Sequence, residues 1–246
     1  MPDPTLSGSR PLYVEPTLLR ADEHSTLGLE PTNAAYDFAR HTHIIPVTVG
    51  ELAETSAHYP LVFMGDDHVP VAVTGLTGAD NLFVGDDGRW HEDSYIPAYI
   101  RQYPFVLVPT DSGDSALCID TACDRLTSEG GQPLFSNGQM TPLLQKAAHL
   151  CREYEASAAQ TRQQIDTLKS CGVFKSARIE LSAPNAAAHT LDFVGIEMAS
   201  VHQCSDAQKA QLVDSGAIAW VIAFGFSQRH WSYLATIARN RTGGQP

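Results

Sequence analysis

The chain has 246 residues, a formal net charge of −12 and a pI near 5.1. An apolar fraction of 43% with 18% charged residues is typical of a folded globular protein and excludes a disordered chain. Because an acidic surface repels phosphate groups, this charge argues against nucleic acid and anionic membranes as partners. We expect one domain over residues 11–240, with short flexible tails at 1–10 and 241–246.

The apolar runs and the cysteines indicate a cytoplasmic protein. The first residues lack an apolar core of signal-peptide length. The longest apolar run, Ala217–Phe226, has about half the length of a bilayer-spanning helix, so we expect no membrane insertion. The five cysteines are odd in number and irregularly spaced, which favours reduced, buried thiols over a disulfide framework.

The first half of the chain repeats one pattern. Thr48 and Glu51 form a capping box that starts a helix, and the helix ends before Tyr59-Pro60. A strand at Leu61–Met64, a Gly-Asp-Asp turn and a second strand at Val69–Leu76 follow. A further short strand is predicted at Leu82–Val84.

The second copy of the pattern lies 44 residues further along, measured between its Tyr-Pro dipeptide and the first one. Asp93-Ser94 is expected to cap a helix over Tyr95–Gln102, which leads to Tyr103-Pro104. Strands are predicted at Phe105–Val108 and Ala116–Ile119. The two copies predict one mostly antiparallel sheet built from two helix-hairpin units.

The second half is more helical. Thr141-Pro142 is a strong helix start, and apolar residues at heptad spacing continue to Gly172, which predicts a helix of about 45 Å. We expect this helix to pack within its own chain; a dimeric coiled coil is the alternative. A hairpin around Pro184-Asn185, a helix capped by Ser205 and a buried terminal helix over Ala217–Arg239 complete the α+β fold. The long helix and the terminal helix are expected to cover the sheet.

The strongest candidate for a ligand- or partner-binding site is an aromatic patch with two guanidinium groups. Tyr95 and Tyr99 share a face if both are helical, because residues four apart lie one above the other. Such a face can recognise a peptide, an aromatic group or a carboxylate. The alternative is that these rings only pack the helix onto the sheet. The candidate residues are Arg89, Trp90, Tyr95, Tyr99 and Arg101.

Histidines and carboxylates offer a weaker candidate metal site. The spacing of His41 and His43 places both on one face of a strand, and Asp66, Asp67 and His68 occupy a predicted turn. Two histidines and one carboxylate can hold non-haem iron. The compact His-x-Asp or His-x-Glu element usual in iron oxygenases is missing, as are nucleophile and phosphate-loop motifs. We expect no metal, no cofactor and no catalytic residue.

Several sequence blocks carry a family resemblance. They are Tyr59–Phe63, Asn81–Val84 with Asp87–Trp90, Tyr95–Phe105, Leu117–Asp120 with Pro133–Phe135, and Thr141–Leu144. With these blocks the chain resembles the SapC family of bacterial proteins. The resemblance implies an accessory role around TonB-dependent uptake or the modification of peptides or aromatic compounds.

The function expected from these observations is that of a soluble, non-catalytic accessory or binding protein. Its expected partner is a protein or peptide, and a homo-oligomer is compatible with the sequence. One alternative is a metal-dependent enzyme similar to non-haem iron oxygenases. The other is a structural component associated with a surface layer, as the family name suggests.

Overall fold

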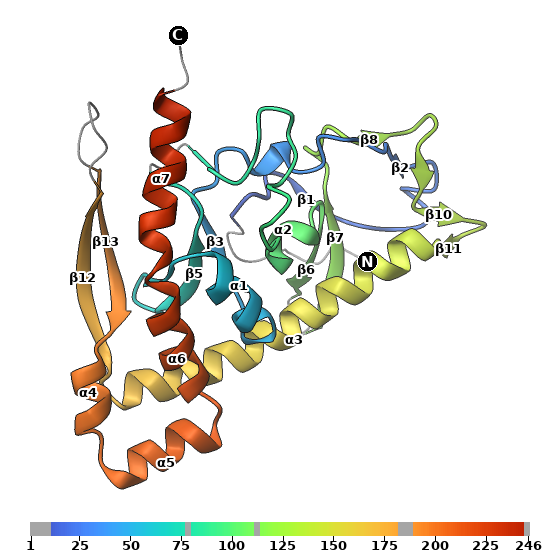
Figure 1. The fold of residues 1–246 in the computed structure, drawn as a ribbon. Coiled ribbons are helices and arrows are strands. Elements are labelled where there is room, and N and C mark those ends of the chain that lie inside the picture. The colour runs from blue at the N-terminus through green and yellow to red at the C-terminus, as the bar shows by residue number, and fades with distance from the viewer. Residues whose placement is uncertain (1–10, 77–79, 111–113, 182–188, 244–246) are drawn as a thin grey trace. The chain divides into compact units, whose positions relative to one another are not determined.

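A computed structural model describes residues 11–76, 80–110, 114–181 and 189–243 (Figure 1). The fold is mixed α+β, with several small antiparallel sheets and one long helix. The chain forms two compact units, each built from two separate segments. Unit 1 comprises Met1–Ala35 and Ala98–Ala156, and unit 2 comprises Tyr36–Pro97 and Ser157–Pro246. The single domain over 11–240 stays a prediction.

The described part of unit 1 contains three small sheets, one short helix and the beginning of the long helix. The three-stranded sheets have the orders β1-β7-β6 and β8-β2-β9, and β10 pairs with β11. Alternate residues of β6 and β7 face two different apolar clusters, one containing Phe105 and Ile119, the other Val106 and Cys118. The elements are β1 (Pro16–Leu18), β2 (Gly28–Leu29), α2 (Ala98–Arg101), β6 (Phe105–Pro109), β7 (Ser115–Asp120), β8 (Leu126–Thr127), β9 (Gln132–Pro133), β10 (Phe135–Ser136) and β11 (Gln139–Met140).

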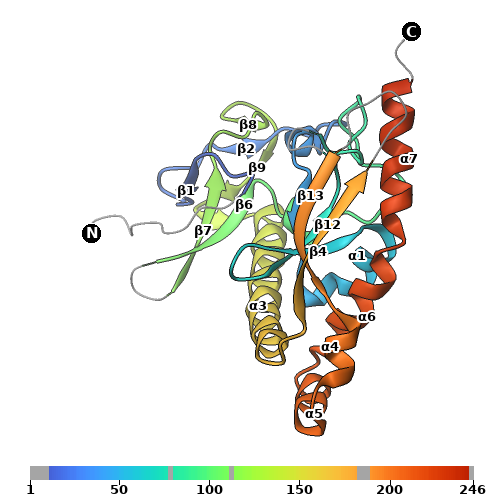
Figure 2. The ribbon, with the colours of Figure 1, turned by 90° about the vertical axis from the view of Figure 1, so that its left-hand side faces the viewer.

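Unit 2 contains a five-stranded sheet of order β12-β13-β4-β5-β3. The hairpin of β12 and β13 is its longest part (Figure 2). The elements are η1 (Asp37–Ala39), β3 (Ile44–Pro46), η2 (Val49–Glu51), α1 (Leu52–His58), β4 (Leu61–Met64), β5 (Val69–Val73), β12 (Phe174–Leu181), β13 (His189–Ile196), α4 (Met198–Gln203), α5 (Asp206–Asp214), α6 (Ile218–Ser227) and α7 (His230–Gly243).

The core of unit 2 centres on Phe63 of β4. Its ring lies 4.9 Å from that of Phe174, 6.2 Å from Trp220 and 6.0 Å from Phe224, measured between centroids. Trp220 is fully buried, and its indole N–H donates to Oε1 of Gln164 at 2.8 Å. The polar atom of this large core residue is therefore satisfied, as burial of an indole requires.

The predicted repeat is confirmed at the level of local structure. In each copy a helix leads through Tyr-Pro into a hairpin, and an earlier strand pairs with the second hairpin strand. The carbonyls of Pro60 and Pro104 accept corresponding bonds, each 2.9 Å long, from Val73 N and Asp120 N. The next residue is a threonine in both copies, and its N–H donates to the earlier segment. The prediction of one shared sheet is wrong, because each copy belongs to the sheet of its own unit.

The long helix α3 (Pro142–Ser170) confirms the predicted helix. Thr141 lies at its start, with Oγ1 3.5 Å from Leu144 N, and Gly172 follows its end with a φ of 67°. Its apolar stripe packs within the chain, with Leu144, Cys151, Ile165 and Leu168 all buried. The first part of α3 belongs to unit 1 and the second part to unit 2.

Three other predicted elements differ from the structure. The helix expected over Tyr95–Gln102 covers only Ala98–Arg101, because Pro97 removes a helical N–H and disfavours helical backbone at Ile96. The predicted strand Leu82–Val84 is reduced to one bridge between Val84 and Trp90. The terminal helix is divided into α6 and α7, and α7 extends to Gly243, into the predicted C-terminal tail. The predicted N-terminal tail and the turn at 184–185 lie outside the described residues.

The cysteine prediction agrees with the structure, in which all five thiols are free and buried. Within the described ranges, no single helix has the length and apolarity to cross a membrane. The bent pair of α5 and α6, at 83°, meets that criterion only when both helices are counted together, and only by length and composition.

Candidate functional site

A tight hairpin loop over residues 84–90 forms the framework of the candidate site. Gly85 N donates to the carbonyl of Arg89 at 2.8 Å, and Gly88 N donates back to the carbonyl of Gly85 at 2.9 Å. Gly88 has a φ of 72°, a conformation that favours glycine. This turn brings Val84 opposite Trp90 and holds the charged residues at the loop tip apart from the buried ones.

Three buried aromatic residues, Tyr59, Phe83 and Trp90, pack together beneath the exposed tip of the loop. The Trp90 indole N–H donates to the hydroxyl of Tyr59 at 3.1 Å, and that hydroxyl donates to the carbonyl of Tyr95. Phe83 stacks on Trp90 with centroids 6.4 Å apart, and its centroid lies 4.7 Å from that of Tyr59. Burial raises the pKa of the Tyr59 phenol, so this group stays a neutral donor. The loop therefore rests on a rigid, hydrogen-bonded aromatic base.

Arg241 of α7 binds the segment that leads into the loop. Its guanidinium donates to the carbonyls of Asn81, at 3.2 Å, and Val84, and it pairs with Asp80 at 3.3 Å. The amide of Asn81 is also engaged, because its Nδ2 donates to the carbonyl of Ala39 at 3.1 Å. These bonds join the end of α7 to a loop more than half the chain away in sequence.

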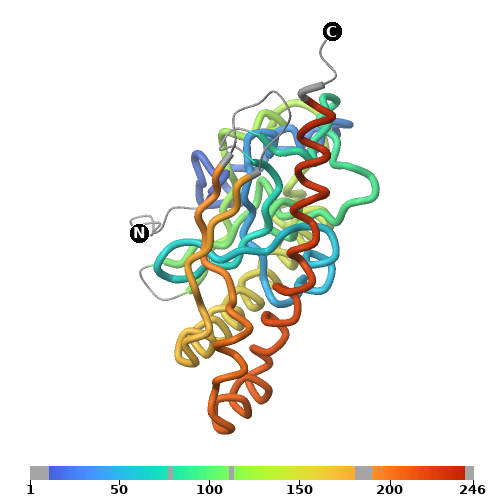
Figure 3. The backbone as a smooth tube through the Cα atoms, turned by 60° about the vertical axis from the view of Figure 1, so that its left-hand side comes forward, coloured from blue at the N-terminus to red at the C-terminus, as the bar shows by residue number. Residues whose placement is uncertain are grey.

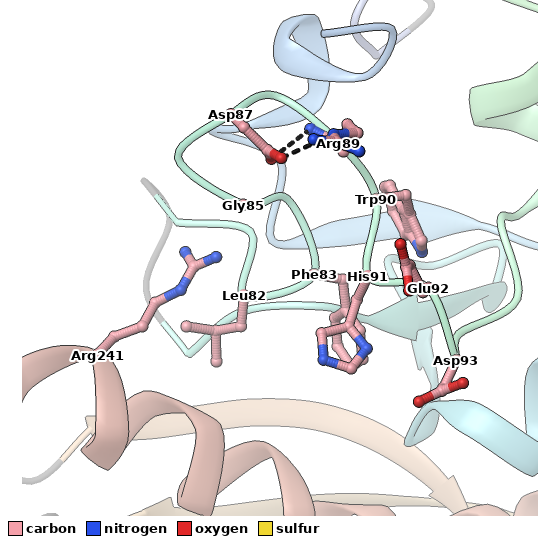
Figure 4. A pocket seen from close by; sticks show the side chains of 10 residues that line it. All are labelled: Leu82, Phe83, Gly85, Asp87, Arg89, Trp90, His91, Glu92, Asp93 and Arg241. Atoms are coloured by element: carbon pink, nitrogen blue, oxygen red, sulfur yellow. Dashed lines mark hydrogen bonds and ion pairs between the residues drawn. The ribbon is translucent and has the colours of Figure 1, made fainter. Parts of the chain in front are cut away.

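A pocket of about 430 Å³ lies between this loop and α7 (Figure 4). Arg241 reaches toward the loop from α7, and the other lining residues belong to the loop and the segments on either side of it, within residues 82–93. Phe83 and Trp90 are buried, whereas the charged side chains of the loop are exposed. The lining residues are Leu82, Phe83, Gly85, Asp87, Arg89, Trp90, His91, Glu92, Asp93 and Arg241.

Some of the charged side chains around the pocket form ion pairs with described residues, and others do not. Arg89 Nε pairs with Asp87 at 2.8 Å, and the hydrogen bonds from Arg89 hold the pKa of Asp87 below its ordinary value. Glu92 and Asp93 are exposed and have no ion-pair partner in the part of the chain that the structure describes. The pocket therefore presents two uncompensated carboxylates beside buried aromatic rings.

The predicted aromatic patch divides between the two units. Arg89, Trp90 and Tyr95 belong to unit 2, whereas Tyr99 and Arg101 belong to unit 1. Tyr95 precedes α2, so Tyr95 and Tyr99 do not share a helical face. Of the five candidates, only Arg89 and Trp90 line the pocket.

Tyr99 is a packing residue of unit 1. It is 2% exposed, and its ring lies 5.9 Å from that of Tyr13 and 5.6 Å from that of Tyr154. Its hydroxyl donates to the carbonyl of Pro11. Arg101 is exposed at the end of α2, and its role in recognition stays a prediction.

The candidate metal ligands lie at opposite ends of one strand. His41 and His43 precede β3, which begins only at Ile44, so the prediction that both occupy a strand face is wrong. Ile44 pairs with Val73, at one end of β5, whereas Asp66 and His68 occupy the turn at its other end. At about 3.3 Å per residue, a five-residue strand separates the two pairs by roughly 13 Å or more. No group of three or more potential ligands comes together among the described residues.

Sequence reasoning missed part of the pocket. Arg241 was assigned to a tail, and no local pattern links it to residues 80–84, since the contact depends on where α7 ends. Phe83 belonged to a predicted strand. The run His91-Glu92-Asp93 directly after Trp90 is the sequence signal that marks this part of the pocket.

The fold and the pocket define a mixed α+β protein with an aromatic-based, charge-rimmed pocket, and no cluster of three or more potential metal ligands lies among its described residues. A family model described as SapC matches residues 19–234. The chain belongs to the SapC family. No curated protein and no solved structure gives a significant match to it.

Replacing Arg241 by alanine is expected to loosen the pocket loop. The carbonyls of Asn81 and Val84 lose their charged donor, which lowers the free energy of local opening by about 1–3 kcal/mol. Amide hydrogen exchange over residues 81–91 should accelerate accordingly. Arg178→Ala is the control, because the guanidinium of Arg178 pairs with Asp192 in the β12–β13 hairpin, outside the pocket lining. Unchanged exchange in Arg241→Ala would show that the loop is held by other contacts.

Proposed function

We propose that this chain is a non-catalytic binding protein that acts as an accessory to other proteins, and that a protein or peptide segment docks in the pocket beside Trp90. The observation that carries the proposal is the rim of exposed charged side chains above buried, hydrogen-bonded aromatic rings. A pre-formed base of this kind loses little conformational entropy on binding. A few polar groups around an apolar floor are typical of ligand sites.

The charge balance favours a partner with a basic group. Asp87 is already paired with Arg89, and Arg241 is engaged by Asp80 and two carbonyls. Glu92 and Asp93 therefore supply the charge that a ligand meets. A lysine or arginine side chain would pair with these two carboxylates.

The setting of this function is also a proposal. Five buried free thiols fit a reducing compartment, which supports action in the cytoplasm. The link to TonB-dependent uptake or to modification of peptides and aromatic compounds comes from the family resemblance alone.

The proposal is tested with an array of short peptides that vary in charge, followed by calorimetry of the bound sequences. Basic peptides should bind the wild-type chain. The double variant Glu92→Gln with Asp93→Asn should weaken them about tenfold or more, because it removes the charge but keeps the shape. Both positions are exposed, so the fold should be retained.

Asp166→Asn is the matched control, since Asp166 is an exposed carboxylate on α3 outside the pocket lining. It should leave the affinity unchanged. Wild-type affinity in the double variant would remove the pocket as the binding site. An array without any bound basic peptide would contradict a basic peptide partner.

A further inference from the structure

Helix α6 presents apolar side chains on two opposite sides. Trp220, Val221 and Ala223 are buried in unit 2. Ile222 and Phe226, in contrast, are 53% and 64% exposed. The sequence predicted that this helix would be buried, yet two of its large apolar residues point outward.

The exposed residues form one continuous face. Ala219, Ile222 and Phe226 are spaced by three and four residues, which places them on one side of a helix. Gly225 is exposed beside them. Helices α6 and α7 follow one another with only a short turn between them (Figures 1 and 3), so the face lies on an extended helical segment.

Among the residues that the structure describes, none packs closely against the Cα hydrogens of Gly225. A Cβ atom at this position meets no heavy atom within 4 Å, and Gly225 is not among the residues with positive φ. A glycine inside a helix is unfavourable relative to alanine. The distance between two packed helices depends on the side chains at their contact. Because glycine has no side chain, Gly225 allows a second helix to approach α6 closely.

Opposite charges flank this face. Asp214 precedes α6, and Arg229 follows it. Both are exposed, and neither has an ion-pair partner in residues 11–76, 80–110, 114–181 and 189–243. A surface with an acid at one end and a base at the other is complementary to an antiparallel copy of itself.

We propose that the α6 face (Ala219, Ile222, Gly225 and Phe226) docks onto the same face of a second copy of this chain, with the two helices antiparallel around a two-fold axis at Ile222. In this register Ala219 faces Gly225 of the other copy, which permits close approach. Phe226 faces Ile218, and Arg229 lies at the end where the other copy bends by 83° from α5 into α6, the end that carries Asp214. The inference is independent of the pocket.

Sedimentation of the full chain tests the proposal. The wild-type chain should form a species of twice its 26.6 kDa mass in a concentration-dependent manner. Gly225→Leu should weaken dimerisation about tenfold or more, since the added side chain separates the helices. The same substitution should not lower the unfolding midpoint, because the position is open and leucine favours a helix.

Two further variants separate this face from general surface effects. Phe226→Glu should give a folded monomer, whereas Met198→Glu, an exposed apolar position on α4, should leave the dimer intact. Arg229→Asp and Asp214→Arg should each weaken the dimer, and their combination should restore it.

Three outcomes would overturn the proposal. The first is a wild-type chain that stays monomeric at every concentration up to its solubility limit. The second is a dimer with the same affinity in the wild type, Gly225→Leu and Phe226→Glu. The third is a monomer that co-sediments with neutral phosphatidylcholine vesicles through Phe226, which would assign the face to lipid.

Discussion

Phe63→Ala is expected to lower the free energy of unfolding by about 3–5 kcal/mol, the usual cost of removing a buried phenyl ring. Phe63 is 1% exposed and contacts the rings of Phe174, Trp220 and Phe224. These partners come from β12 and α6, so a cavity at Phe63 weakens the packing of both against β4. Urea denaturation followed by circular dichroism measures the loss.

Val69→Ala is the control for this prediction. Val69 begins β5 and pairs with Met64, but its side chain is 44% exposed, so truncation should cost well under about 1 kcal/mol. Equal midpoints for Phe63→Ala and the wild type would mean that Phe63 does not occupy the core.

Asp120→Ala is expected to cost on the order of 3 kcal/mol, because a buried carboxylate in unit 1 accepts several backbone N–H groups. Oδ1 accepts from Glu15 N at 2.8 Å and Ala122 N at 3.3 Å, and Oδ2 accepts from Val14 N at 3.1 Å. Asp120 is fully buried. Removing its side chain leaves these donors without their acceptor and releases the segment that leads into β1. Denaturant unfolding measures the effect.

Asp124→Ala separates this role from loss of charge. Asp124 lies in the same turn region but is exposed, so its truncation should change stability by no more than about 0.5 kcal/mol. Asp120→Asn keeps one acceptor oxygen and should fall between the two. A stability of Asp120→Ala equal to that of Asp124→Ala would contradict the anchoring role.

The environment of Asp120 also affects Tyr103. Burial, together with the neighbouring Cys123 thiol and the Asp120 carboxylate, raises the pKa of the Tyr103 phenol. Burial likewise raises the pKa of the Cys123 thiol. Both groups therefore stay protonated at neutral pH, and Cys123 is a weak nucleophile.

The parts of the fold that depend on local signals were predictable. The Thr48–Glu51 capping box is formed, with Thr48 N donating to Glu51 Oε1 at 3.2 Å. The Tyr-Pro dipeptides mark the start of both hairpins, the Gly-Asp-Asp turn marks the first of them, and Ser205 caps α5 as expected. These signals act within a few residues, so one sequence suffices to recognise them.

Features that depend on long-range contacts were not predictable. The sequence pattern of a hairpin does not indicate which sheet the hairpin joins. For this reason the prediction of one shared sheet is wrong. The outward face of α6 was missed because an apolar helix does not reveal which side meets its own core. Trp90 and Arg89 were identified as site residues, but Arg241 depends on a contact spanning 157 residues. Within the aromatic patch, Pro97 is the local signal that excludes Tyr95 from the helix.

The two-segment construction of each unit has a consequence for biosynthesis. Both segments of unit 1 have been synthesised once Ala156 has been translated. The first segment of unit 2, Tyr36–Pro97, can complete its fold only after the second segment, which starts at Ser157, has been synthesised. The apolar strand Leu61–Met64 therefore leaves the ribosome long before Phe174, Trp220 and Phe224, which cover Phe63. Uncovered apolar strands promote aggregation of nascent chains. Yield in cells should accordingly depend on chaperones that hold this strand until the last helices emerge.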